Sequence, residues 1–153
     1  MDKELHNATL QPVTTVISNC PLSIHPDAPL PEILERFSKQ GNHPLIVMNR
    51  DGTVAGLITM MDLIQAITPG TGLRGKHHIG MLDRYLKSTA QTAEDLVSDE
   101  SLTVREGATI SDALRRMEHT HSSSLIIVNE KNVAVGCIEL ADIIAHLYRS
   151  GSR

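Results

Sequence analysis

The sequence predicts an α+β protein made of two copies of one unit, each with the element order β-α-β-β-α. Two observations support this prediction. Residues 15–70 align on residues 95–150 without a gap, at an offset of 80, and twelve of the 56 aligned pairs are identical, where average residue frequencies would give about three or four. Apolar residues also recur at the same places in both copies. A repeat of this length is typical of a duplicated supersecondary unit.

The first copy begins with a turn, a short strand and a helix. Asn19-Cys20-Pro21 favours the turn, and the strand is expected over residues 22–24. The helix follows because Pro31 suits a first turn and Gly41 suits a C-terminal cap. Its apolar residues fall on one helical face: Leu30, Ile33, Leu34 and Phe37.

The rest of the first copy predicts a hairpin and a second helix. Residues 45–48 form a buried apolar strand, and residues 49–52 carry an Asp-Gly signal for a tight turn. Residues 53–58 are expected to return antiparallel, and residues 60–67 to form the helix.

The second copy repeats this order from Leu102 onward. Its first helix carries a clearer start signal, because Thr109 stands at the N-cap position and Asp112 follows three residues later. The buried stripe of this helix is expected to consist of Ile110, Ala113, Leu114 and Met117.

Four segments follow from the repeat: an N-terminal extension over residues 1–14, a first unit over 15–70, a linker over 71–94 and a second unit over 95–150. The extension is polar and lacks periodicity, so we expect a partly ordered lead-in. The stretch between the units is too long for a plain connection. It predicts a short amphipathic helix between residues 79 and 86 and a turn of helix over residues 92–96.

Composition and charge exclude several classes of protein. A net charge of −4 argues against nucleic acid as the main partner, because phosphate binding needs a basic face. The first residues contain no apolar signal core, and the longest apolar runs are far too short to span a membrane. Cys20 and Cys137 lie far apart and outside any metal-ligand spacing, which is typical of reduced thiols. We therefore expect a cytoplasmic protein without a membrane or nucleic-acid partner.

One motif ends the hairpin in both copies. Residues 56–62 read Gly-Leu-Ile-Thr-Met-Met-Asp, and residues 136–142 read Gly-Cys-Ile-Glu-Leu-Ala-Asp. Thr59 and Asp62 have the spacing of a helix capping box, whereas Glu139 replaces the threonine in the second copy and Asp142 stays. An ionised carboxylate there could accept hydrogen bonds from two ribose hydroxyls, beside helix N–H groups that suit a phosphate. Capping and ligand binding are both open, and the second copy favours ligand binding.

A tandem β-α-β-β-α unit that ends in Gly-x-x-Thr-x-x-Asp resembles the CBS domain pair, also called the Bateman module. Residues 16–24 are similar to the family's first strand, and residues 42–47 to its basic-Pro-apolar strand. The resemblance implies two units packed through their sheets with pseudo-twofold symmetry, and two clefts between them that accept adenosine-containing ligands. It also implies a homodimer that regulates an effector protein.

The positions that match the family's ligand-binding residues are Ser18, Leu22, Asn42, His43, Pro44, Thr59, Asp62, Ser98, Leu102, Ser123 and Asp142. Uncharged residues, Met60-Met61 and Leu140-Ala141, stand where many members carry an arginine or lysine that can meet phosphate. AMP, adenosine or S-adenosylmethionine is therefore favoured over ATP. The second copy lacks the threonine and the His-Pro pair, so the first cleft is expected to be the more complete one. His43 is either a phosphate contact or a strand-edge residue.

Three functions are weighed from the sequence. The favoured one is a regulatory ligand-binding module, and the alternative is a dimerisation scaffold with empty clefts. An enzyme comes last, because the sequence contains no nucleophile–base pair, acid pair or metal box, and no catalytic or metal-binding residue is predicted. No cofactor is required, and AMP or another adenosyl compound would be a ligand. The second helices carry more apolar residues than one face needs, which predicts a homodimer.

Residues 70–76 read Gly-Thr-Gly-Leu-Arg-Gly-Lys and are similar to nucleotide-binding loops. Such loops follow a strand, whereas a helix precedes this one, and His77 replaces the hydroxyl residue that would hold magnesium. A linker is the favoured interpretation. His77, His78, His119 and His121 lack a further fixed ligand and are expected to lie on a solvated edge.

Overall fold

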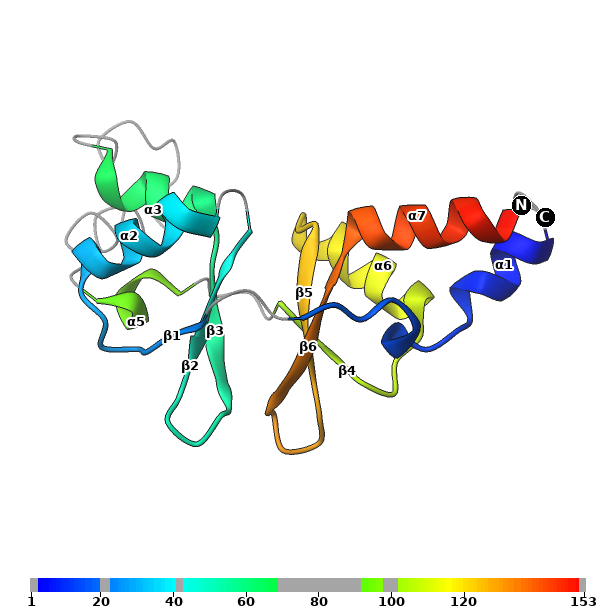
Figure 1. Cartoon of the computed structure of the whole chain (residues 1–153), viewed down its shortest axis with the longest axis horizontal. Coiled ribbons are helices and arrows are strands. Elements are labelled where there is room, and N and C mark those ends of the chain that lie inside the picture. The colour runs from blue at the N-terminus through cyan, green and yellow to red at the C-terminus, as the bar shows by residue number, and fades with distance from the viewer. Residues whose placement is uncertain (1–2, 20–22, 41–42, 69–91, 98–101, 152–153) are drawn as a thin grey trace. The chain divides into compact units, whose positions relative to one another are not determined.

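The computed structural model describes residues 3–19, 23–40, 43–68, 92–97 and 102–151. They form two compact units, each with its own three-stranded sheet (Figure 1). The middle unit comprises Pro21–Asp99, and the terminal unit combines Met1–Cys20 with Glu100–Arg153. The predicted α+β class and the duplicated unit are confirmed.

The middle unit follows the predicted order of elements. In its sheet, β1 is parallel to β2, and β2 is antiparallel to β3. Parallel neighbours need a crossover connection, and α2 provides it between β1 and β2. The elements are β1 (Ser23–Ile24), α2 (Leu30–Gln40), β2 (Leu45–Met48), β3 (Val54–Ile58), α3 (Met60–Ile67) and α5 (Ala93–Leu96).

The terminal unit repeats this arrangement and adds two elements from the start of the chain. Its sheet has the order β4-β5-β6, with β4 parallel to β5 and β5 antiparallel to β6. The elements are α1 (Lys3–Thr9), the 3-10 helix η1 (Val13–Val16), β4 (Thr103–Arg105), α6 (Ile110–Thr120), β5 (Ser124–Val128), β6 (Ala134–Glu139) and α7 (Leu140–Gly151).

Branched aliphatic residues fill most of each core. β2 and β5 are the central strands, and their consecutive apolar residues are buried, a pattern typical of a strand covered on both faces. Ile33 and Phe37 of α2 and Leu96 of α5 belong to the core cluster of the middle unit. The stripe predicted for α6 is confirmed, with Leu114 only half-buried. In α2, Leu34 of the predicted apolar face is exposed, because the buried part of that face is centred on Ile33 and Phe37.

Residues 15–19, which begin the first repeat, belong to the terminal unit, whose sheet comes from the second repeat. Residues 95–97, which begin the second repeat, belong to the middle unit, whose sheet comes from the first repeat. In the terminal unit, Ser18 and Cys137 of β6 exchange two backbone hydrogen bonds of 2.9 and 3.0 Å. In the middle unit, the backbone N–H of Ala93 donates to the carbonyl of Ala28 at 2.9 Å. The boundaries 15–70 and 95–150 therefore describe a duplication in sequence, and as domain limits they stay a prediction.

Gly56 and Gly136, the identical glycines of the shared motif, are points of close approach. A Cβ atom on Gly56 would lie 2.2 Å from Val97 Cγ1, and one on Gly136 would lie 2.4 Å from Ile17 Cδ1. Ile17 and Val97 hold equivalent positions in the repeat. The absence of a side chain at each glycine thus lets Val97 or Ile17 pack directly against the hairpin backbone.

Residues 3–9 form a helix, which the polar and aperiodic sequence of the lead-in did not predict. α1 packs against α7, and Ala8 and Thr9 are buried. Just beyond the helix, His146 Nε2 and Gln11 Oε1 form a hydrogen bond of 2.8 Å. A seven-residue helix is unstable alone, so this one depends on its contacts with α7, which a search for local periodicity does not detect.

Two predictions concern the stretch between the repeats. The turn of helix over residues 92–96 is confirmed as α5, with Thr92 at its N-cap. The helix predicted between residues 79 and 86 lies outside the described residues.

Candidate ligand-binding site

α3 begins with a complete capping box. Thr59 Oγ1 accepts a hydrogen bond from the backbone N–H of Asp62 at 3.2 Å. In return, Asp62 Oδ2 accepts from the backbone N–H and from the hydroxyl of Thr59, both at 2.9 Å. Asp62 is only 6% exposed. The capping role of this pair is confirmed, and it occupies one carboxylate oxygen of Asp62.

Two further predicted ligand residues lie at the same end of the middle sheet. Leu45 pairs with Ile58, so the antiparallel register continues with Pro44 opposite Thr59. His43, the next residue out, is exposed, and Pro44 is half-buried. The middle unit therefore brings the His-Pro pair to the end of the sheet where α3 begins.

α7 begins differently, because Glu139 stands where α3 has a threonine. Ser124 Oγ donates to Glu139 Oε2 at 2.5 Å, across a directly facing pair of β5 and β6. The glutamate thus extends toward the neighbouring strand. Among the residues with described structure, it forms no capping box with Asp142.

Asp142 is exposed in the first turn of α7. Across the described ranges, its carboxylate has no hydrogen-bond or ion-pair partner. The N-terminal end of the helix favours a negative charge at this position, and its first N–H groups can bind an anion. Asp142 can therefore accept hydrogen bonds from a ligand without giving up a capping bond.

Ser18 belongs to the same compact unit as Asp142 and not to that of Asp62. It pairs with Cys137, two residues before β6 ends, and its hydroxyl donates to the Cys137 carbonyl at 3.3 Å. The sequence repeat would group Ser18 with Asp62. The pairing with β6 instead places it next to the strand that leads into α7.

Two more predicted ligand residues lie in the terminal unit. Ser123 is exposed, and its carbonyl accepts from the backbone N–H of Leu140 at 2.8 Å, so it lies where α7 begins. Leu102 is buried, and its carbonyl accepts from the backbone N–H of Ile126 at 2.8 Å. The structure thus assigns Leu102 a packing position, and its ligand role stays a prediction.

Leu22, Asn42 and Ser98 lie outside the described residues, as do residues 70–76 and the histidines that follow them. Where the structure is described, no group of three His, Cys, Asp or Glu side chains could hold a metal ion. No helix in those ranges is long and apolar enough to cross a membrane.

Comparison with known families identifies the repeat. The profile of the CBS domain matches residues 13–69 and, a second time, residues 93–149. The chain belongs to the CBS domain family. The resemblance inferred from the duplicated motif is therefore confirmed. A comparison with curated proteins gives no match.

Several solved CBS structures are similar to this chain. CBSX2 in complex with AMP is 17% identical, with a TM-score of 0.78 over 94% of this chain and 99% of that chain. The CBS domain pair of protein MJ0100, in complex with 5′-methylthioadenosine and S-adenosyl-L-methionine, is 18% identical, with a TM-score of 0.69 over 94% and 99%. The CBS domain of a bacterial CNNM/CorC family Mg2+ transporter in complex with ATP is 15% identical, with a TM-score of 0.67 over 95% and 92%. At these identities, the likeness establishes the fold.

The sequence interpretation missed two features of the candidate site. It did not place Ser18 beside β6, because the sequence shows only that Ile17 and Val97 are matched apolar positions, and their contact with the two glycines is visible only in the structure. It also missed the bond between Ser124 and Glu139. Simple counting from the pair Val128–Ala134 beside the turn would have placed Ile138 opposite Ser124, and the register shift between Ile127 and Val128 brings Glu139 there instead.

Proposed function

We propose that the chain is a non-catalytic regulatory module that binds an adenosine-containing ligand and passes its occupancy to a partner protein. The observation that carries this proposal is the exposed Asp142 carboxylate at the start of α7, with Ser18 paired to the strand before it. Membership of the CBS family supports it. Similar CBS structures hold AMP, 5′-methylthioadenosine, S-adenosyl-L-methionine or ATP.

The hydrogen-bonding chemistry of a ribose suits Asp142. Its two neighbouring hydroxyls can each donate to one carboxylate oxygen, and such charge-assisted bonds contribute about 1.5–3 kcal/mol each. The first-turn N–H groups of α7 suit a single phosphate. We propose that Asp142 serves one ligand and Asp62 another.

AMP, adenosine and S-adenosylmethionine are proposed to bind more tightly than ATP. Uncharged residues fill the positions between the capping residue and the acid in both motifs, Met60-Met61 and Leu140-Ala141. The extra phosphates of ATP would therefore find no cationic side chain at these positions. His43, which is exposed at the end of the middle sheet where α3 begins, is the predicted phosphate contact in the middle unit.

A thermal-shift panel with AMP, adenosine, ATP, S-adenosylmethionine and NAD tests the proposal. A ligand at a hundred times its dissociation constant stabilises the folded chain by about 2.7 kcal/mol. For a chain of this size, that corresponds to a rise of about 5–10 °C in melting temperature. We expect AMP to give such a rise and ATP a smaller one. If none of the five raises the melting temperature at millimolar concentration, the ligand-binding proposal is wrong.

A dimerisation scaffold is the second candidate function, and one observation favours it. α3 and α7 both leave large apolar side chains in solvent, and the equivalent residues Ile64 and Ile144 are 45% and 57% exposed. Met61 and Tyr148 extend these apolar faces, at 62% and 76% exposure. Apolar faces of this kind favour burial against a second copy. Sedimentation at micromolar concentration should show a dimer that Ile64→Glu with Ile144→Glu disrupts, and a monomeric wild type would exclude the scaffold.

A further inference from the structure

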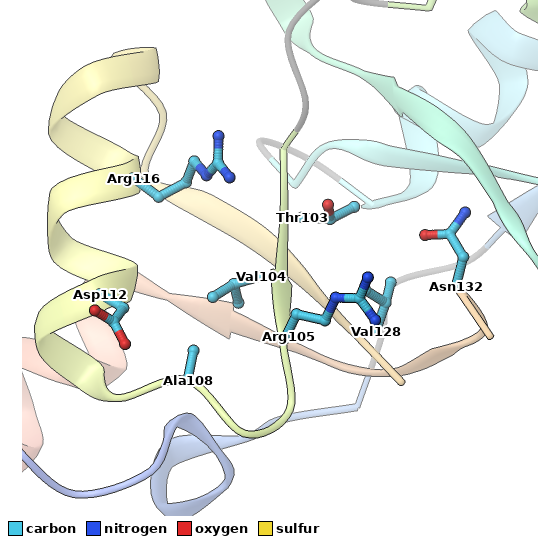
Figure 2. Close-up of a pocket in the computed structure, with 8 residues that line it drawn as sticks. All are labelled: Thr103, Val104, Arg105, Ala108, Asp112, Arg116, Val128 and Asn132. Carbon is cyan, nitrogen blue, oxygen red and sulfur yellow. The ribbon is translucent and has the colours of Figure 1, made fainter. Parts of the chain in front are cut away.

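A pocket lies at one edge of the terminal sheet, along β4, whereas β6 forms the other edge. Among the described strands β4 pairs with β5 alone, so it is the edge strand there. The pocket has a volume of about 340 Å3 and is bordered by β4, α6 and the turn at Asn132. Figure 2 shows Arg116 extending from α6 on one side of β4, and Arg105 extending from β4 toward Asn132 on the other. Two guanidinium groups therefore flank the pocket.

Both arginines lack protein partners within the described ranges. They are exposed, and neither guanidinium forms a hydrogen bond or ion pair there. Asp112 also borders the pocket, but its Oδ2 accepts from the backbone N–H of Thr109 at 2.9 Å, and its Oδ1 lies 3.2 Å from Arg115 Nη2. The pocket thus combines two cations that have no partner in the described part of the chain with one carboxylate that is already engaged.

In the middle unit, the arginine at the position equivalent to Arg116 forms an ion pair. This arginine, Arg36, lies 4.0 Å from Glu32, one helical turn earlier. Glu32 is equivalent to Asp112, whose side chain is one methylene shorter and bonds to the start of its own helix. Arg116 therefore loses the intrahelical partner that Arg36 keeps.

The position of Arg105 shows the same contrast. Its equivalent, His25, pairs with Asp27. Asp27 is replaced by Gly107 in the terminal unit, and a Cβ atom on Gly107 would meet nothing within 4 Å. The terminal unit therefore has a permanent cation where the middle unit has a histidine, and it lacks the equivalent of the acid that pairs with that histidine.

The edge of β4 adds a backbone donor to the pocket. The backbone of Leu102 and of Glu106 bonds to β5, since the Leu102 carbonyl accepts from Ile126 and the Glu106 N–H donates to Val128. In a parallel pair, the intervening odd-numbered residues face the other way. The N–H of Arg105 therefore points to the free edge, where the pocket lies.

We propose that this pocket binds the phosphate group of a small phosphorylated molecule between Arg105 and Arg116. Guanidinium groups match phosphate oxygens with two parallel N–H bonds each, and two of them on opposite sides can hold one phosphate group. The volume exceeds what a single phosphate needs, so the pocket has room for part of an organic group. This site shares no residue with the proposed adenosyl sites and does not depend on them.

The test is a titration of the full chain with inorganic pyrophosphate at low ionic strength, followed by amide NMR and calorimetry. We expect saturable shifts at Arg105, Ala108 and Arg116. Arg105→Gln and Arg116→Gln should each weaken binding about tenfold, the loss expected for one charge-assisted contact. Gly107→Asp should weaken binding similarly, because it restores the acid that the middle unit places beside His25.

Arg36→Gln is the matched control, because it removes the same charge from the equivalent, paired position. It should change pyrophosphate binding less than twofold. If Arg36→Gln weakens binding as much as Arg105→Gln or Arg116→Gln does, the loss reflects only the change in net charge, and the proposal is overturned. The absence of saturable shifts at 10 mM pyrophosphate would also overturn it. Tighter binding of citrate than of pyrophosphate would assign the pocket to carboxylates and contradict the phosphate class. Arg105→Gln should leave the rise in melting temperature caused by AMP intact, so this proposal and the adenosyl proposal can fail separately.

Discussion

The helix starts of α3 and α7 hold the same acid in different surroundings. Asp62 is buried and closes a capping box with Thr59. Asp142 is exposed, and the residue in the capping position, Glu139, bonds to Ser124 of the neighbouring strand instead. One substitution at the N-cap thus separates a carboxylate used for helix capping from one that can accept bonds from a ligand. Identity at equivalent positions of a duplicated motif does not establish identity of role.

The largest expected difference between the two acids concerns ligand affinity. Asp142→Asn should weaken AMP binding about thirty- to a hundredfold, because it removes charge-assisted ribose bonds of about 2–3 kcal/mol in total. Asp62→Asn should weaken AMP binding less, since part of that carboxylate is committed to Thr59. Calorimetry of both variants, each first shown to be folded, measures the difference.

Two results would change this comparison. Equal losses from Asp62→Asn and Asp142→Asn would indicate two equivalent sites. A larger loss from Asp62→Asn would support the expectation from sequence that the first cleft is the more complete one.

The glycines of the motif should behave alike in both units, in contrast to the acids. Gly56→Val and Gly136→Val each place atoms where Val97 or Ile17 already lies, at less than 2.5 Å from a Cβ atom. We expect each variant to lower the free energy of unfolding by about 1–3 kcal/mol, as overpacking usually does. Urea denaturation measures the loss. Adding Ile17→Ala to Gly136→Val should recover part of it, and no recovery would mean that the crossing segment is not the cause.

Substitutions at the N-cap positions of α3 and α7 should change the free energy of unfolding by different amounts. Thr59→Ala deletes the hydroxyl that accepts from the backbone N–H of Asp62, and the loss of such a cap costs about 1 kcal/mol. Glu139→Gln can keep a hydrogen bond with Ser124, so it should change the free energy of unfolding by less than about 0.5 kcal/mol. Thermal or urea unfolding of the two variants compares them. A stability loss at Glu139 as large as that at Thr59 would show that both positions cap their helices.

The smallest expected effect concerns the pH dependence of stability. Asp112 of α6 serves as the reference, because it is an exposed acid that caps a helix. The hydrogen bond from the backbone N–H of Thr109 is the main cause that lowers the pKa of Asp112 below its ordinary value. The folded pKa is depressed, so the stabilisation is present above about pH 4 and is lost as the pH falls through the folded pKa. Asp112→Asn should therefore reduce the loss of stability between pH 5 and pH 2. Urea midpoints across this range test it, and an unchanged pH dependence would contradict it.

Features that depend on neighbours in the chain were predictable from the sequence. The capping boxes at Thr59 and Thr109 were visible because their partners follow three residues later, and a helix start requires that spacing. The strands and the hairpins followed from apolar runs bounded by turn residues. The offset of 80 revealed the duplicated unit and hence the family.

Tertiary structure alone decided which partners meet across long separations. Ser18 pairs with Cys137, 119 residues away, and α1 is helical where it packs on α7. No pattern in the neighbouring sequence predicts either contact, because both are stabilised by burial and backbone pairing between distant segments. The same holds for the exposed Asp142 and for Arg105 and Arg116, which have no ion-pair partner among the described residues. The residues are visible in the sequence, but only the fold determines which neighbours each charge has.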